Sequence, residues 1–316
     1  ALRASGKRVA VFARSTDNLP LPFHAPEVGV FRDSINDREA VRAIVQRTPV
    51  VVNLAHGGGG ATSAEIEAAM VGGARLVAEE ALAAGCSQLV FVPSIAALYL
   101  GDGQAKVTAA TPPDPNFDGR VAYARAKVLA DQAMLAMHRK QGLPVTIMRP
   151  GVVLGQGTSP FHSGIGLYNR EAHCVGWNRG DNPLPLVLGE DVASAIVAVI
   201  GNSETIGRTL NLVGDVRLSA QEYTAALGQA TGRNLSYHPQ PAWSLQAEEL
   251  GKWAVKRLGG RKVGLPNYQD LKSRGLAAAF DCSTEQELLG WWPESERERF
   301  LAKAFAGYAD QPNHAG

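Results

Sequence analysis

The sequence predicts an α/β fold with a doubly wound parallel sheet, and two observations carry this prediction. Strand-like and helix-like segments alternate along the chain as far as about Gly151. The strand-like segments are almost continuously apolar, as expected when helices cover both faces of a parallel sheet. The expected strands span residues 8–13, 28–34, 49–56, 88–94 and 144–151, and the expected helices span 37–48, 63–85 and 121–142.

Composition places the chain among globular proteins. Apolar residues make up 45% of its 316 residues and charged residues 19%. A net charge of +1 gives no electrostatic reason to expect nucleic acid or a membrane surface as a partner. The three widely spaced cysteines and seven scattered histidines form no disulfide or metal pattern, so we expect no metal and a cytoplasmic location.

The pattern changes after about Gly151, where long irregular stretches rich in Gly, Asn, Pro and Trp begin. We expect residues 1–150 to form the sheet domain and residues 151–316 to form mainly a smaller, less regular lobe. Residues from about 187 to 214 are expected to return to the first domain. Helices are expected near 190–200 and 219–231.

Three residues could carry acid–base chemistry. Tyr123 and Lys127 are four apart on an expected helix, so their side chains share one face. A neighbouring ammonium stabilises a phenolate and lowers its pKa. Ser94 ends an apolar strand at the sheet edge where open α/β sheets bind ligands. The alternatives are an ordinary helix face with a solvated lysine, and a serine that only forms a strand-end turn.

The order Ser94, Tyr123, Lys127 resembles the short-chain dehydrogenase/reductase superfamily. The closer likeness is to its extended branch, the NAD-dependent epimerase/dehydratase family, which includes dihydroflavonol-reductase-like proteins. Further segments resemble that family in the right order: VFVPSIAALY, TIMRPGVVLGQG, GEDVASAI and AAAFDCSTEQELLGWWPE. The matches run from Arg8 to about Glu294.

The resemblance implies a Rossmann-type dinucleotide-binding domain and a C-terminal substrate lobe. It assigns Tyr123 as the general acid/base, while Lys127 lowers its pKa and holds the nicotinamide ribose. Ser94 orients the substrate oxygen, and hydride moves to or from the nicotinamide. Pro150 and Val153 belong to the segment that lines the nicotinamide end of the cofactor.

The family's glycine-rich phosphate loop joins its first strand to its first helix. The opening ALRASGKRVAVFARS instead resembles the end of that helix, with Ser5-Gly6-Lys7 as its stop, followed by the second strand. We therefore expect about 20–25 residues, including the first strand and the loop, to be missing from the sequence as given. Gly57–Gly60 offers an alternative phosphate cradle. Its place in the family pattern is nearer the middle of the cofactor, where Leu54 and Ala55 would touch it.

The end of the second strand of this family separates NAD from NADP. An acidic residue there binds the ribose 2′-hydroxyl, whereas a basic residue suits a 2′-phosphate. Here Arg14 and Ser15 occupy that position, which predicts NADP as the preferred cofactor, with NAD possible; the alternative is that Arg14 is only a solvated charge. Asp33 and Ser34 match the position beside the adenine.

The substrate is expected between the sheet edge and the second lobe. His162, Tyr168, His173 and Trp177 lie in the segment that usually lines that cleft, and aromatic or imidazole groups suit a ring-shaped or polyoxygenated small molecule. The alternative for each residue is local packing.

Three functions compete. The leading one is an NAD(P)-dependent oxidoreductase acting on a carbonyl or secondary alcohol. The others are a nucleotide-sugar epimerase or dehydratase with tightly bound NAD, and a non-catalytic dinucleotide sensor. Relatives dimerise through the Tyr-Lys helix, so the resemblance also implies a homodimer.

Overall fold

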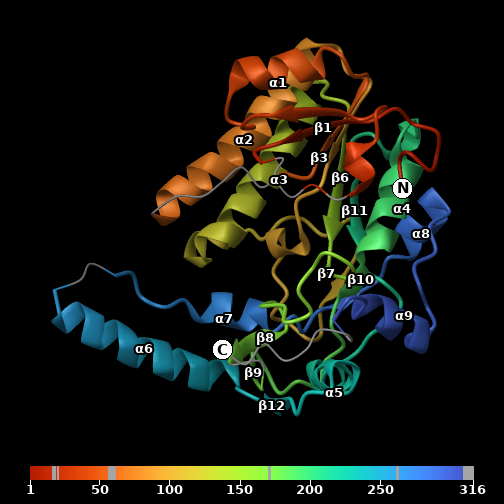
Figure 1. Cartoon of the computed structure of the whole chain (residues 1–316). Coiled ribbons are helices and arrows are strands. Elements are labelled where there is room, and N and C mark those ends of the chain that lie inside the picture. Colours follow the sequence, from red (N-terminus) through yellow and green to blue (C-terminus); the bar gives the residue numbers. More distant parts are fainter. Residues whose placement is uncertain (16–18, 20, 56–61, 170–171, 261–262, 309–316) are drawn as a thin grey trace.

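The computed structural model describes residues 1–15, 19, 21–55, 62–169, 172–260 and 263–308, and it confirms the predicted α/β fold (Figure 1). The strands are β1 (Ala10–Ala13), β2 (Gly29–Arg32), β3 (Val50–Asn53), β4 (Gln88–Phe91), β5 (Lys106–Val107), β6 (Val145–Pro150), β7 (Val152–Leu154), β8 (Gly166–Asn169), β9 (His173–Gly176), β10 (Leu186–Leu188), β11 (Thr209–Leu212), β12 (Ser236–His238) and β13 (Ala279–Phe280). The α-helices are α1 (Arg38–Val45), α2 (Ser63–Ala83), α3 (Ala122–Gln141), α4 (Gly189–Val199), α5 (Ala220–Thr231), α6 (Ala242–Leu258), α7 (Tyr268–Arg274), α8 (Ser283–Leu289) and α9 (Arg297–Ala304).

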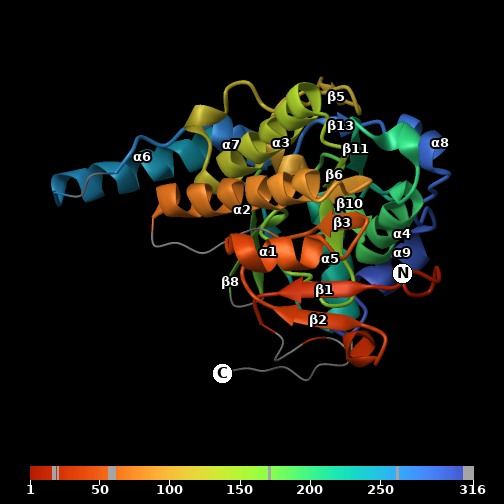
Figure 2. The ribbon, with the colours of Figure 1, turned by 90° about the horizontal axis from the view of Figure 1, so that it is seen from above.

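A parallel sheet in the order β11-β6-β4-β3 forms the centre of the fold. Successive side chains of a strand point to opposite faces. Leu89 and Phe91 of β4 therefore join the core formed with α1, α2 and α3, whereas Val90 joins the core that contains α4. Figures 1 and 2 show α2 and α3 packed together on one face and α4 on the other, which is the doubly wound arrangement.

Local signals explain where the two long helices of the first face begin and end. Thr62 caps α2 and forms a reciprocal capping box with Glu65, so the helix starts at Ser63. Helix α3 ends at Gly142, whose φ of 74° is left-handed backbone that glycine adopts without steric cost. These signals fix the direction of the helices that cover β3, β4 and β6.

The parallel strands β1 and β2 form a sheet of their own and are not hydrogen-bonded to β3. A cavity of about 900 Å³ separates β1 from β3, and it is lined mostly by apolar side chains of both strands, of α1 and of α4. Val51 and Val52 are only half-buried, whereas every residue of β4 is buried. Strands β1 and β3 thus each have one edge whose backbone groups form no hydrogen bonds with another described strand.

Beyond Gly151 the chain builds smaller sheets and then returns to the centre. Strands β7 and β10 pair with each other, and β12, β9 and β8 form a three-stranded sheet. Strand β11 then pairs with β6, so the segment 209–212 is part of the central sheet. Trp291 fastens the C-terminal segment to α4, because its indole N–H donates to the carbonyl of Asp191 (2.8 Å). Helix α6 projects from the body in both views (Figures 1 and 2).

Residues 1–6 are too short to be assigned as a helix, but their hydrogen bonds are those of a helix end, as predicted. The Ser5 N–H donates to the carbonyl of Ala1 (3.1 Å), and Gly6, with a left-handed φ of 75°, and Lys7 donate back to Arg3 (2.9 Å) and Leu2 (3.1 Å). The other expected helices and strands of the first half are present, within a few residues at each end. Among the described residues, no helix is long and apolar enough to cross a membrane, and no group of three or more metal-ligating side chains occurs.

Candidate active site

Ser94 lies at the carboxyl edge of the central sheet, three residues after β4 ends. Its Oγ accepts a hydrogen bond from the N–H of Ala96 (3.2 Å) and so caps the short 3-10 helix η2 (Ile95–Ala97). The turn role considered as the alternative is therefore present. It uses Ser94 as an acceptor only, and the hydroxyl proton remains available for donation.

Tyr123 and Lys127 share one face of α3, as predicted. Tyr123 is 42% exposed, Lys127 is buried, and the Lys127 Nζ lies 5.3 Å from the centre of the Tyr123 ring. Desolvation raises the pKa of Tyr123, and a hydrogen bond from the Ser94 hydroxyl partly counters this. The structure thus brings together the three residues predicted to be catalytic. They present a hydroxyl, a phenol and an ammonium group at one sheet edge.

The chain contains a second Tyr-x-x-x-Lys pair, which shows that the spacing alone defines no site. Tyr268 and Lys272 lie on α7, with the Lys272 Nζ 6.0 Å from the centre of the Tyr268 ring. Tyr268 is also 42% exposed. What distinguishes Tyr123 is its place on a helix that packs against the turn of Ser94, at the end of a central parallel strand, and the burial of its lysine.

Burial of Lys127 has a cost that a substitution should remove. Desolvation lowers the pKa of Lys127 to about 8, from an ordinary value of 10.5. The unfolded chain therefore binds this proton more tightly, and at pH 7 the buried charge lowers the free energy of unfolding by up to roughly 3 kcal/mol. We expect Lys127→Met to raise that free energy by about 1–3 kcal/mol, measured by urea unfolding.

The pH dependence gives this prediction a second measurement. Between about pH 8 and pH 10.5 the unfolded state holds the Lys127 proton and the folded state releases it, so the stability contribution of Lys127 rises with pH. That rise should be absent in Lys127→Met. Lys272→Met is the matched control and should alter neither quantity. Equal or lower stability of Lys127→Met at pH 7 would contradict the prediction.

A buried ion pair that sequence analysis did not predict lies below Lys127 on α3. The Arg149 Nε donates to the Asp131 carboxylate at 2.6 Å, and both side chains are almost completely buried. Arg149 also donates from Nη1 to the carbonyl of Thr111 (3.0 Å). The pair therefore ties β6 and the loop before α3 to the helix that bears Tyr123 and Lys127.

The residues predicted to bind the adenosine end of the cofactor follow β1 and β2. Arg14 and Ser15 come directly after β1, and Asp33 and Ser34 come directly after β2. The Asp33 N–H donates to the carbonyl of Ala13 (3.1 Å), which places the two pairs at the same end of this small sheet. The side chain of Arg14 is exposed, so its guanidinium is accessible to an anionic ligand.

The residues predicted to contact the middle of the cofactor follow β3. Leu54 and Ala55 are exposed and line the cavity between β1 and β3. Beside them, the Asn53 Oδ1 accepts a hydrogen bond from the Ala55 N–H (3.0 Å). The Asn53 Nδ2 is buried, and no hydrogen-bond partner for it occurs in the described part of the chain. A polar ligand beside β3 would satisfy this donor.

The residues predicted to line the nicotinamide end of the cofactor lie in β6 and β7. Pro150 is the buried last residue of β6, and Val153 is half-buried in β7. That they line the nicotinamide end of the cofactor remains a prediction. The alternative phosphate cradle at residues 57–60 lies outside the described residues.

Two of the four predicted substrate residues lie against the core of the C-terminal region. The His162 Nδ1 accepts from the Gly164 N–H (2.9 Å), and burial lowers the pKa of His162. The Tyr168 ring packs edge-on against Phe161, with ring centres 5.2 Å apart, and burial raises the pKa of Tyr168. Both residues have packing roles in this structure.

The other two have different surroundings. His173 is exposed, and its Nδ1 lies 3.0 Å from the Nε2 of His238. Trp177 is buried against α6 and α7, and its indole N–H donates to the carbonyl of Ser163 (2.7 Å). The four residues differ in burial and in their partners, and their substrate roles remain predictions.

The fold and the Ser-Tyr-Lys arrangement define an enzyme of the extended short-chain dehydrogenase/reductase type. The sequence profile of the NAD dependent epimerase/dehydratase family matches residues 1–212. The chain belongs to this family. The relationship suggested by the ordered sequence segments is therefore confirmed.

Known relatives are distant. A protein of Sinorhizobium fredii, "Uncharacterized protein y4nG", is 25% identical over 313 residues, which cover 98% of this chain and 74% of the relative. The crystal structure of gox2253 has a TM-score of 0.79 at 18% identity, over 96% of this chain and 91% of that chain.

Two further solved structures contain ligands. The dTDP-glucose 4,6-dehydratase DesIV of Streptomyces venezuelae, with NAD and TYD bound, has a TM-score of 0.68 at 19% identity, over 94% of this chain and 86% of that chain. The UDP-glucuronic acid 4-epimerase of Bacillus cereus, in complex with UDP-glucuronic acid and NAD, has a TM-score of 0.72 at 14% identity, over 98% of this chain and 92% of that chain. These likenesses show the shared fold.

Proposed function

We propose that this protein is an NAD(P)-dependent oxidoreductase that transfers hydride between the nicotinamide and a carbonyl or secondary alcohol of a small molecule. The observation that carries the proposal is the buried Lys127 ammonium 5.3 Å from the Tyr123 ring, on a helix that packs against the short helix capped by Ser94. A nicotinamide dinucleotide, when bound, supplies or accepts the hydride. The protein's own groups then have to orient the substrate oxygen atom and transfer one proton to or from it.

Each of the three residues has a separate task in this scheme. Ser94 donates a hydrogen bond to the substrate oxygen and orients it. Tyr123 gives its phenolic proton to the alkoxide formed in reduction, or removes the alcohol proton in oxidation. Lys127, whose pKa of about 8 keeps it mostly charged at pH 7, stabilises the phenolate that results.

The second candidate is a nucleotide-sugar epimerase or dehydratase in which hydride returns to the same substrate. It is favoured by the NAD and the sugar nucleotide found in the structural relatives. The two functions differ in what happens to the cofactor. An oxidoreductase releases the oxidised or reduced cofactor at every turnover, whereas an epimerase or dehydratase retains NAD.

One experiment separates these candidates. The purified protein is denatured with acid, and the supernatant is assayed for NAD and NADP, while the native protein is tested for oxidation of NADPH and NADH with a panel of aldehydes and ketones. Net oxidation of NADPH with carbonyl substrates supports the oxidoreductase. Stoichiometric NAD in the supernatant without net oxidation supports the epimerase or dehydratase.

Arg14 gives a prediction on cofactor choice. If its exposed guanidinium pairs with the 2′-phosphate, Arg14→Ala should weaken NADPH binding about tenfold, the effect of losing one exposed charge-assisted contact. Binding of NADH should be unchanged, as measured by fluorescence titration. Arg32→Ala, at the exposed end of β2, is the control and should alter neither affinity. Equal binding of both cofactors, unaffected by Arg14→Ala, would contradict the proposed NADP preference.

A further inference from the structure

Helix α3, which carries Tyr123 and Lys127, has no capping group in its own sequence. Helices α2 and α5 start with complete capping boxes, in which a Glu three residues after the cap accepts the N–H of the capping residue. Before α3 the capping position is Val121, whose side chain makes no cap. Ala124 stands where the other two helices have Glu, so it cannot accept a hydrogen bond.

Asp270 supplies the missing group from 149 residues further along the chain. Its Oδ1 accepts the Val121 N–H at 3.1 Å, the same bond that Glu makes in a capping box. Asp270 is buried on α7, and its own N–H is held by the side chain of Asn267 (3.2 Å). A carboxylate in this place also interacts favourably with the positive end of the α3 dipole.

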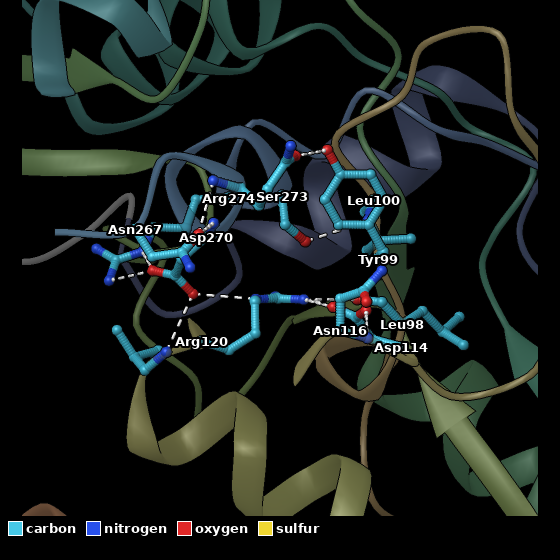
Figure 3. Close-up of polar contacts among 12 residues, drawn as sticks. Leu98, Tyr99, Leu100, Asp114, Asn116, Arg120, Asn267, Asp270, Ser273 and Arg274 are labelled. Carbon is cyan, nitrogen blue, oxygen red and sulfur yellow. Dashed lines mark hydrogen bonds and ion pairs between the residues drawn. The ribbon is translucent and has the colours of Figure 1, made fainter. Parts of the chain in front are cut away.

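Arg120 extends this contact into a buried network (Figure 3). Its Nε donates to the Asp270 Oδ1 at 3.0 Å, and its Nη1 donates to the Asp114 Oδ2 at 2.7 Å. The Nη1 also donates to the carbonyl of Leu98 (3.3 Å). The guanidinium thus lies between two carboxylates, next to the residue where α3 begins.

The same network holds the segment that follows Ser94. The Asp114 N–H donates to the carbonyl of Ala97 at 2.8 Å, and Ala97 ends the short helix that Ser94 caps. From α7, the hydroxyl of Ser273 accepts the N–H of Leu100 (3.1 Å), as Figure 3 shows. The start of the Tyr123 helix and the segment of Ser94 are therefore fastened to one helix of the C-terminal region.

We propose that Asp270 is a positioning residue that sets the distance between Ser94 and Tyr123, by capping α3 and holding Arg120. The proposal rests on the proposed function, because the distance matters through the shared substrate oxygen. Asp270 touches neither reacting side chain and acts through Val121 and Arg120. A displacement of about 1 Å of a reacting group can lower turnover about 100-fold.

Three substitutions, with a fourth in reserve, test the proposal. Asp270→Ala removes the acceptor of both Val121 and Arg120. Asp270→Asn keeps an oxygen in that place, since Asn caps helices as well as Asp does. Arg274→Ala is the matched control, because Arg274 pairs with the other carboxylate oxygen of Asp270 (3.0 Å) and leaves the cap intact. Asp270→Ser replaces Asp270→Ala if the latter does not fold, since its short side chain cannot reach Val121.

The first measurement is hydrogen–deuterium exchange of the segment 121–127, which is independent of any reaction. We expect faster exchange there in Asp270→Ala, and wild-type exchange in Asp270→Asn and Arg274→Ala, while β4 is unchanged in all three. The second is steady-state kinetics. We expect kcat to fall about 10- to 100-fold in Asp270→Ala with little change in KM, and to stay within about threefold of wild type in the other two.

The outcomes separate the two proposals. Wild-type exchange of segment 121–127 in Asp270→Ala would overturn the capping role. Faster exchange with unchanged kcat would overturn the positioning role, and so would equal losses in Asp270→Ala and Asp270→Asn. If the wild-type protein itself turns over no substrate of the panel, the proposed function fails, and the exchange data alone then decide whether Asp270 caps α3.

Discussion

Tyr123→Phe should lower kcat by about 10²- to 10⁴-fold, the range expected when a positioned general acid or base is removed. The substitution deletes one oxygen atom and keeps the ring. The Lys127 Nζ lies 5.3 Å from the centre of the Tyr123 ring, and α3 contains no other hydroxyl group that could replace the phenol. Cofactor affinity should change little, because Lys127 is intact. Initial rates with NADPH and titration of the bound cofactor measure the two quantities.

The chain provides its own control for this prediction. Tyr268→Phe removes a phenol that is equally exposed, on another helix, with a lysine four residues later. It should leave kcat within about twofold of wild type, as most substitutions away from a reacting centre do. Retention of most activity in Tyr123→Phe, or a comparable loss in Tyr268→Phe, would refute the assignment of Tyr123 as the acid/base.

Arg149→Met should lower the free energy of unfolding by about 3–5 kcal/mol, the usual cost of leaving a buried charge without its partner. Arg149 is the largest completely buried side chain among the described residues, and its partner Asp131 has no exposed surface. The substitution also frees the carbonyl of Thr111. Urea unfolding at pH 7 measures the loss.

A double substitution and a change of pH test the reason for this loss. Arg149→Met with Asp131→Leu should recover most of the stability, since no unpaired charge remains. In Arg149→Met alone, burial raises the pKa of Asp131 further, so the folded state binds a proton that the unfolded state has lost. The deficit should therefore shrink as the pH is lowered from 8 to 5. A deficit that is independent of pH and persists in the double variant would attribute the loss to packing.

The parts of this structure that sequence could predict are local. Alternating apolar strands and amphipathic helices predicted the doubly wound sheet, because each signal lies within one segment. A strand end and a four-residue helical spacing could predict where Ser94, Tyr123 and Lys127 lie, whereas their catalytic roles come from the family resemblance and remain a prediction. The spacing was a weak signal, as Tyr268 and Lys272 demonstrate, and the two pairs are separated by the nearness of α3 to the turn of Ser94 and by the burial of Lys127.

The parts that sequence missed depend on contacts between distant segments. A signal for the Asp131–Arg149 pair did exist, because Arg149 is the one charged residue of β6 and Asp131 lies one helical turn beyond Lys127. A buried charge in a central strand requires a partner of opposite sign. No comparable signal exists for Asp270, which stands on a short polar helix, 149 residues from the N–H that it accepts.

The long-range cap of α3 also bears on the order in which the protein can assemble as it is synthesised. Domains generally fold from the N-terminus while the rest of the chain is still being made. The sheet from β3 to β6 and both long helices are complete by residue 150, but the first turn of α3 gains its acceptor only when Asp270 has been made. If Asp270 positions the two segments as proposed, a nascent chain contains Ser94, Tyr123 and Lys127 well before it can hold them in place, and it becomes active only late in its synthesis.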